Sequence, residues 1–222
     1  GVVTPFLPRW LEEDRGLTGV EIGAVVAAAQ LARILVGPVI AAWADGFRDR
    51  RTPIRILTIA GLGLYGLFSV SSGFVALLMF SLAAATFTQA LTPLVEGAAL
   101  RASRTGAIPF GVARGIGSGA FILANVAAGW LIGVYGPRMA IVWLLASLAL
   151  AVASAWLLEP DAAPTAAASL GFRGRLQRGA GLMLEPRFLR IVMGAGLIQS
   201  AHAFYYSFSA LVWRSQGISD SA

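Results

Sequence analysis

The stretch "FVALLMFSLAAATFTQALTPLVEGAAL" (Phe74–Leu100) is long and apolar enough to cross a membrane, and its one ionisable side chain is Glu96. A helix rises about 1.5 Å per residue, so roughly 20 residues span the hydrocarbon core of a bilayer. A carboxylate is costly to hold in apolar surroundings unless it is paired or protonated. The sequence therefore predicts a membrane-spanning helix here and a partner that compensates the charge of Glu96.

The rest of the chain repeats this pattern. Of the 222 residues, 57% are hydrophobic and 13% are charged, whereas soluble domains carry about 25% charged residues. Further stretches of spanning length are Val20–Ala44, Ile54–Ser71, Gly111–Tyr135, Arg138–Leu158 and Ile191–Trp213. Gly1–Leu11 is expected to be the last part of another helix, so the chain is expected to be a piece of a longer protein. These features predict an all-α, multi-pass membrane protein.

The basic residues are sorted by side, which predicts the orientation of the spans. All 17 are Arg, and alternating the loops places eleven on one side and four on the other, with Arg33 and Arg114 inside spans. The eleven are Arg48, Arg50, Arg51, Arg55, Arg101, Arg104, Arg173, Arg175, Arg178, Arg187 and Arg190. The four are Arg9, Arg15, Arg138 and Arg214. Because positive charge favours the cytoplasmic side, loops 45–55, 101–110 and 159–190 are predicted to be cytoplasmic. The net charge of +6 is then explained by the orientation of the chain in the membrane and does not indicate binding to nucleic acid.

Several chemistries are excluded by composition. The chain has no Cys, so it has no disulfide, no catalytic thiol and no thiolate metal site. The absence of Lys excludes the Schiff base of a retinal-type receptor. There is one His and no H-E-x-x-H or G-x-S-x-G motif, so we expect no enzyme activity, no cofactor and no metal site.

Two segments suggest how the chain is divided. Six spans lead to residue 158, a cytoplasmic linker is predicted over residues 159–187, and residues 188–222 are predicted to begin a second half. The basic part of the linker, "FRGRLQR", is expected to be solvated, with a short amphipathic surface helix as the alternative. "RWLEEDRGLTGVE" and "LVWRSQGISDSA" share a pattern whose glycines, Gly16 and Gly217, lie 201 residues apart. A parallel repeat of this period fits a transporter of two six-helix halves.

Other local signals concern how the helices begin, bend and pack. Thr18 and Glu21 have the T-x-x-E spacing of a capping box. Pro38 and Pro93 are predicted to bend their spans. Gly117 and its neighbouring glycines are predicted to let helices approach closely.

"GPVIAAWADGFRDRR" (Gly37–Arg51) resembles the conserved loop between the second and third helices of the major facilitator superfamily. Asp45, Arg50 and Arg51 match that motif, while Ala41 and Gly46 depart from it. "PLVEGAAL" with "FGVARGIGSGAF" resembles lactose permease-like proton symporters, and "HAFYYSFSALVW" with "QGIS" is similar to the phenylpropionate permease-like branch. The resemblance covers essentially the whole chain. It implies a six-helix N-terminal bundle followed by the first helix of the second half.

Glu96 finds its predicted partner in Arg114. Glu96 lies nine residues before Thr105, the centre of a predicted loop, and Arg114 lies nine residues after it. Equal distances from the turn of a helical hairpin give equal depth, here roughly 10 Å below the interface. The two groups are therefore expected to pair. The resemblance to lactose permease-like symporters implies that both bind substrate, with a purely structural pair as the alternative.

The remaining polar groups within spans form a second set of candidate residues for substrate binding or proton transfer. Arg33 lies near the middle of its span with Gln30 on the same face. It is expected to face a polar cavity or to reach Glu96 from a neighbouring helix, with a purely structural role as the alternative. His202 is a candidate for proton transfer alongside Glu96, although a lone His is often a hydrogen-bonded packing group. The residues proposed to line a pocket near it are Gln199, Phe204, Tyr205 and Tyr206.

Together these features predict a proton symporter in the cytoplasmic (inner) membrane. It would move a small polar organic solute, such as an aromatic monocarboxylate, by alternating access. The expected partners are the lipid bilayer, the substrate and protons, and a monomer is expected. The alternatives are a sugar or nucleoside symporter, a channel, and a non-transporting receptor or assembly protein on the same scaffold. Import and export are both open.

Overall fold

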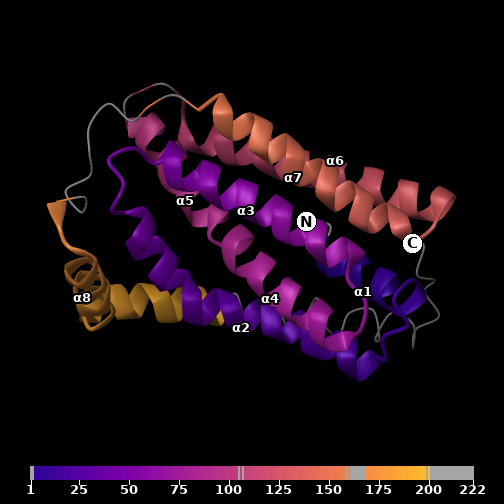
Figure 1. The fold of residues 1–222 in the computed structure, drawn as a ribbon. Helices are drawn as coiled ribbons and strands as arrows, with labels where there is room; N and C mark the ends of the chain where they lie inside the picture. The colour runs from indigo at the N-terminus through magenta and orange to yellow at the C-terminus, as the bar shows by residue number, and fades with distance from the viewer. Residues whose placement is uncertain are drawn as a thin grey trace. The chain divides into compact units, whose positions relative to one another are not determined.

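The computed structural model describes residues 3–104, 106, 108–158, 160, 169–198 and 200. The chain divides into two compact units, Gly1–Arg175 and Leu176–Ala222. All regular elements of the described residues are α-helices (Figure 1). They are α1 (Val3–Glu13), α2 (Gly19–Ala44), α3 (Arg51–Val70), α4 (Phe74–Gln89), α5 (Leu91–Arg104), α6 (Phe110–Tyr135), α7 (Arg138–Trp156) and α8 (Phe172–Met183). A further helical stretch covers residues 186–198.

The predicted all-α membrane fold is confirmed. Among the described residues, five segments are long and apolar enough to cross a membrane. They are Gly19–Ala44, Arg51–Val70, Phe74–Arg104, Phe110–Tyr135 and Arg138–Trp156, each within a few residues of a predicted span. The predicted span Ile191–Trp213 lies largely outside the described residues.

The capping box predicted at the start of the second helix is present. The backbone N–H of Thr18 donates to Glu21 Oε2 at 2.8 Å, and the Glu21 N–H donates to Thr18 Oγ1 at 3.4 Å. These two bonds satisfy backbone donors that the first turn of a helix leaves without partners. The start of α2 at Gly19 is therefore set by local sequence.

The predicted bend at Pro93 is a break between two helices. Proline has no N–H and clashes with the carbonyl four residues earlier, which here belongs to Gln89. Helix α4 ends at Gln89 and α5 begins at Leu91. The interruption is confined to Ala90, which keeps right-handed helical backbone angles (φ −72°, ψ −17°), so Phe74–Arg104 still forms one membrane-spanning segment.

Helix α3 packs against both α4 and α7, and α4 packs against α2 (Figure 1). The larger core cluster is centred on Trp10, Phe68 and Leu77, each at most 1% exposed. The rings of Trp10 and Phe68 lie 5.4 Å apart. A second, smaller cluster around Ile54, Leu57 and Leu94 joins α3 to α5. These contacts hold α5 at a fixed position in the bundle.

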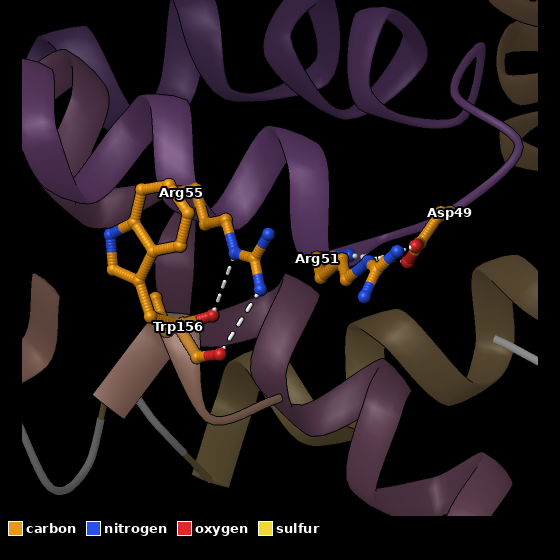
Figure 2. A network of polar contacts seen from close by, with 5 residues as sticks. Asp49, Arg51, Arg55 and Trp156 are labelled. Atoms are coloured by element: carbon orange, nitrogen blue, oxygen red, sulfur yellow. Dashed lines mark hydrogen bonds and ion pairs between the residues drawn. The ribbon is translucent and has the colours of Figure 1, made fainter. Parts of the chain in front are cut away.

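One end of the bundle is fastened by Arg55. Its Nε and Nη2 donate to the carbonyl oxygens of Ala155 and Trp156 at 3.0 and 3.1 Å. Its guanidinium carbon lies 4.5 Å from the centre of the Trp156 ring (Figure 2). This clamp joins the start of α3 to the end of α7.

The opposite end is fastened by a different set of arginines. Arg138 forms an ion pair with Asp14 at 3.3 Å. Arg15 donates to the carbonyl of Ser69 and stacks 4.8 Å from the centre of the Trp10 ring. The turns after α1, α3 and α6 therefore share one end of the bundle. This is the alternation that the arginine distribution predicted.

Residues 172–183, which were expected to be a solvated linker, form the helix α8. Helix was the alternative left open for this basic part of the segment. It contains no buried residue, so its helical form does not rest on a buried side-chain face.

Candidate functional site

Glu96 and Arg114 form the predicted ion pair. Glu96 lies on α5, Arg114 lies on α6, and Arg114 Nη1 donates to Glu96 Oε1. The two helices run antiparallel and are joined by the turn after Arg104, so residues at equal distances from that turn lie at equal depth. The pairing inferred from sequence spacing is confirmed. The proposed role of the pair in substrate binding remains a prediction.

Within the described residues the ion pair is only partly covered by its neighbours. The side chain of Glu96 is 44% exposed and that of Arg114 is 59% exposed. Both residues lie on membrane-spanning segments, so the energies of ion pairs in bulk water do not apply to them.

A cavity of about 650 Å³ lies between α5 and α6 at this pair. Its polar lining is provided by Thr92, Glu96, Arg114 and Ser118. Its apolar lining includes two aromatic rings and several aliphatic side chains, namely Val95, Ala99, Phe110, Ala113, Phe121 and Ile122. We call it cavity 1. One charged pair beside a largely apolar wall suits a small molecule with a polar end and an apolar body.

Sequence reasoning missed the lining residues of cavity 1 on α6. Phe110, Ser118 and Phe121 lie four residues before, four after and seven after Arg114, the spacings that place side chains on one helix face. That spacing was the available signal. Gly117 also lines the cavity, and no described atom lies within 4 Å of where its Cβ would be. The predicted close helix contact at Gly117 is therefore not seen among the described residues and stays a prediction.

Glu96 also borders a second cavity, of about 550 Å³, between α2 and α4–α5. We call it cavity 2. Its polar lining is Asp45, Arg50, Thr86, Gln89, Thr92 and Glu96. Glu96 and Thr92 line both cavities, so this turn of α5 separates two spaces of different character.

The loop between α2 and α3 contains two ion pairs. Arg50 Nη2 lies 3.4 Å from Asp45 Oδ1, and Arg51 pairs with Asp49 (Figure 2). Asp45 is the C-terminal cap of α2. Arg50 and Arg51 are therefore each held by a carboxylate, that of Asp45 and that of Asp49. The predicted role of Asp45, Arg50 and Arg51 in conformational change is not tested by this geometry.

Gln30 lies apart from cavity 1. It lines a third cavity of about 260 Å³ together with Tyr65, Ser81, Thr88, Gln89 and Thr92. Arg33 lies in α2, but its side chain is outside the described residues. The predicted pocket residues Gln199, His202, Phe204, Tyr205 and Tyr206 also lie outside them.

The described residues contain no group of three or more His, Cys, Asp or Glu side chains arranged to hold a metal ion. The side chains that line cavity 1 supply an ion pair, two hydroxyl groups and aromatic rings. Binding and proton transfer are within reach of these groups.

Comparison with known proteins identifies the family to which this chain belongs. The model of the MFS_1 like family matches residues 1–222. The chain belongs to the MFS_1 like family. This assignment confirms the resemblance to the major facilitator superfamily of membrane transporters that the loop and hairpin motifs indicated.

A curated relative of this MFS_1 like chain is the "Probable 3-phenylpropionic acid transporter" of Escherichia coli (strain K12). The two are 29% identical over 225 residues, an alignment that covers 100% of this chain and 58% of the relative. The chain thus spans little more than half the length of that protein. No solved structure matches the chain.

Proposed function

We propose that the protein is a proton-coupled secondary transporter that moves a small aromatic monocarboxylate across the cytoplasmic membrane by alternating access. The observation that carries this proposal is the Glu96–Arg114 ion pair at cavity 1, whose lining also includes Phe110 and Phe121. The name of the Escherichia coli relative, a probable transporter of an aromatic carboxylic acid, supports the same substrate class.

In this proposal Arg114 binds the carboxylate of the substrate. A guanidinium presents its N–H groups as a planar fork that matches a carboxylate. The ion pair borders cavity 1, so a substrate bound there could replace Glu96 as the partner of Arg114. The apolar wall of cavity 1 then receives the aromatic body.

The charges within the spans favour an anionic substrate. Arg33 and Arg114 carry two positive charges and Glu96 carries one negative charge, with His202 taken as neutral. An excess positive charge at membrane depth is unfavourable unless an anion balances it. A substrate carboxylate supplies that balance, whereas a neutral sugar does not.

Proton coupling follows from the same exchange. Once the substrate carboxylate holds Arg114, the Glu96 carboxylate loses its positive partner, and protonation removes its uncompensated charge. His202 is a second candidate for this role. The proton would thus enter with the substrate and leave when Glu96 pairs with Arg114 again.

The whole transporter is proposed to contain two six-helix halves. Residues 1–158 belong to the first half, residues 159–187 connect the halves, and residues 188–222 begin the second. The arginine-rich loops 45–55, 101–110 and 159–190 are assigned to the cytoplasm. Asp45, Arg50 and Arg51 are proposed to change partners during the transport cycle.

Uptake of radiolabelled 3-phenylpropionate into proteoliposomes that contain the full-length protein tests the proposal. We expect saturable uptake driven by an inwardly directed proton gradient and abolished by a protonophore. Glu96→Gln and Arg114→Gln should each reduce uptake at least 100-fold, while thermal unfolding in detergent shows that both variants are folded. Normal transport kinetics in either variant would refute the site. Accumulation that is insensitive to a protonophore would refute proton coupling.

A further inference from the structure

Cavity 2 has features that substrate binding at cavity 1 does not use. It extends from Glu96 to Asp45, so two carboxylates border one continuous space. Asp45 caps the end of α2 in the arginine-rich loop, and Glu96 lies deeper, in the second turn of α5. The cavity therefore links the ion-pair site to one face of the membrane.

Groups between the two carboxylates can bind water. The Thr86 hydroxyl donates to the carbonyl of Leu82 at 2.8 Å, which leaves its oxygen lone pairs as acceptors. Gln89 contributes a side-chain amide and a backbone carbonyl, and that carbonyl cannot receive the usual helical bond because residue 93 is proline. A space of about 550 Å³ with several polar groups is roomy and polar enough to hold water.

We propose that cavity 2 is a proton pathway between Glu96 and the arginine-rich face, separate from the path that the substrate takes through cavity 1. This inference rests on the proposed function, in which Glu96 carries the coupled proton. The Glu96 carboxyl group breaks its O–H bond and passes the proton to a water molecule in cavity 2. Water molecules hand it on to the Asp45 carboxylate or to the bulk, and Glu96 remains as a carboxylate paired with Arg114.

Charged groups surround the proposed pathway. Arg114 on α6 pairs with Glu96 beside cavity 1. On the other side, Nη1 of Arg50 lies 2.5 Å from where a Cβ of Gly97 would be, so a guanidinium is packed against the residue next to Glu96. Asp45 lies at the far end of cavity 2 and pairs with Arg50. Helix α2 also carries Glu21 in its first turn and Arg33, whose side chain lies outside the described residues.

Gly37 allows the pathway to be blocked without touching cavity 1. It lines cavity 2, and no described atom lies within 4 Å of where its Cβ would be. A Leu side chain can therefore enter the cavity without a backbone shift. Gly23, on the same helix, is equally free of described neighbours and lines none of cavity 1, cavity 2 and the third cavity. Gly23→Leu is thus the matched control.

The test compares two modes of transport in proteoliposomes that contain the full-length protein. Uptake of 3-phenylpropionate driven by a pH gradient needs net proton release, whereas exchange of labelled for unlabelled 3-phenylpropionate at equal pH does not. We expect Gly37→Leu to reduce gradient-driven uptake at least tenfold and to change exchange less than twofold. Gly23→Leu should change neither by more than twofold.

A hydroxyl deletion provides a second variant that preserves shape. Thr86→Val removes an oxygen from cavity 2, and Thr88→Val removes the matching oxygen, bonded to the carbonyl of Ala84 at 2.9 Å, from the third cavity. We expect Thr86→Val to slow gradient-driven uptake three- to tenfold with exchange preserved, and Thr88→Val to leave both within twofold.

Equal loss of uptake and exchange in both Gly37→Leu and Thr86→Val would overturn the proton pathway, because cavity 2 would then serve the substrate. Unchanged uptake in both variants would also overturn it. If the wild-type protein exchanges 3-phenylpropionate but shows no response to a pH gradient, proton coupling itself is wrong and the pathway falls with it.

Discussion

Arg114 pairs with Glu96 and lines cavity 1, so in the proposed mechanism a substrate carboxylate competes with Glu96 for it. A single guanidinium can hold one carboxylate through two parallel bonds. The competition between Glu96 and the substrate is what links binding to the protonation of Glu96 in the proposed mechanism.

Replacing Arg114 with Lys separates charge from shape. Lys keeps the positive charge but presents a point-like ammonium in place of the fork. We expect Arg114→Lys to retain about a tenth of the wild-type kcat/KM for 3-phenylpropionate, compared with about a hundredth or less for Arg114→Gln. Initial rates of uptake by the full-length protein measure this ratio. Equal activity of the Lys variant and the wild type would show that the fork plays no part.

The pairing of Glu96 and Arg114 was predictable because a helical hairpin fixes depth by counting residues from the turn. The lining of cavity 1 was not predicted, although Phe110, Ser118 and Phe121 share a face with Arg114. Whether that face meets another helix or a cavity depends on how α6 is rotated against α5 and α7. Rotation follows from packing between distant segments, which one sequence does not reveal directly.

At the scale of elements, the break between α4 and α5 distinguishes this span from the others. Pro38 lies inside α2 without interrupting it, whereas α4 ends at Gln89 and α5 begins at Leu91. A broken helix leaves backbone groups free to bind water or substrate groups within the membrane. The break lies where cavity 2 and the third cavity meet, at Gln89 and Thr92.

Restoring the missing donor tests the role of this break. In Pro93→Ala the new N–H can bond to the carbonyl of Gln89 and join α4 to α5, since proline costs about 3 kcal/mol in a helix interior. We expect hydrogen exchange in residues 89–97 to slow at least fivefold and the uptake rate to fall at least threefold. Pro38→Ala is the control. Unchanged exchange together with unchanged uptake would show that the break is not maintained by Pro93.

The clamp between Arg55 and the end of α7 is a second feature at this scale. Arg55→Gln removes two charge-assisted bonds to carbonyl oxygens and the stacking on Trp156. We expect a loss of about 1–2 kcal/mol in stability, measured as a lower midpoint of thermal unfolding in detergent. Arg51→Gln breaks an ion pair with Asp49 inside the loop and should cost less. An equal or smaller loss in Arg55→Gln would contradict the clamp.

The elements themselves were largely predictable, and the exceptions have physical reasons. Span bounds followed from apolar length, and the start of α2 followed from Thr18 and Glu21. Helix α8 was expected to be a solvated linker because "FRGRLQR" carries three arginines and two polar or flexible residues. In such a segment the helix propensity of Arg and Gln favours a helix, whereas the small number of apolar residues gives no buried face that would stabilise one. The two signals disagree, so the sequence does not decide the structure of this segment.

At the scale of the whole molecule, contacts between distant segments support the alternation of the spans. Asp14 with Arg138 at one end and Arg55 with Trp156 at the other join turns that the sequence assigned to the same sides. The chain covers 58% of its Escherichia coli relative, so the complete substrate path is expected to include residues from the rest of the protein. Arg33 and His202 are proposed to face that path.

The most direct test of the central claim is a competition assay on the full-length protein. Pairs of aromatic carboxylates and their amides compete with labelled 3-phenylpropionate for uptake by the wild type, Arg33→Gln and Arg114→Gln. An anionic substrate held by Arg114 predicts that carboxylates inhibit the wild type at least 30-fold more strongly than their amides. It also predicts that Arg114→Gln shows no saturable uptake, and that Arg33→Gln has a reduced preference. The claim that the substrate is an anion held by Arg114 would be contradicted by one result. In that result, amides or neutral sugars compete as well as carboxylates do, and Arg33→Gln leaves this ranking unchanged.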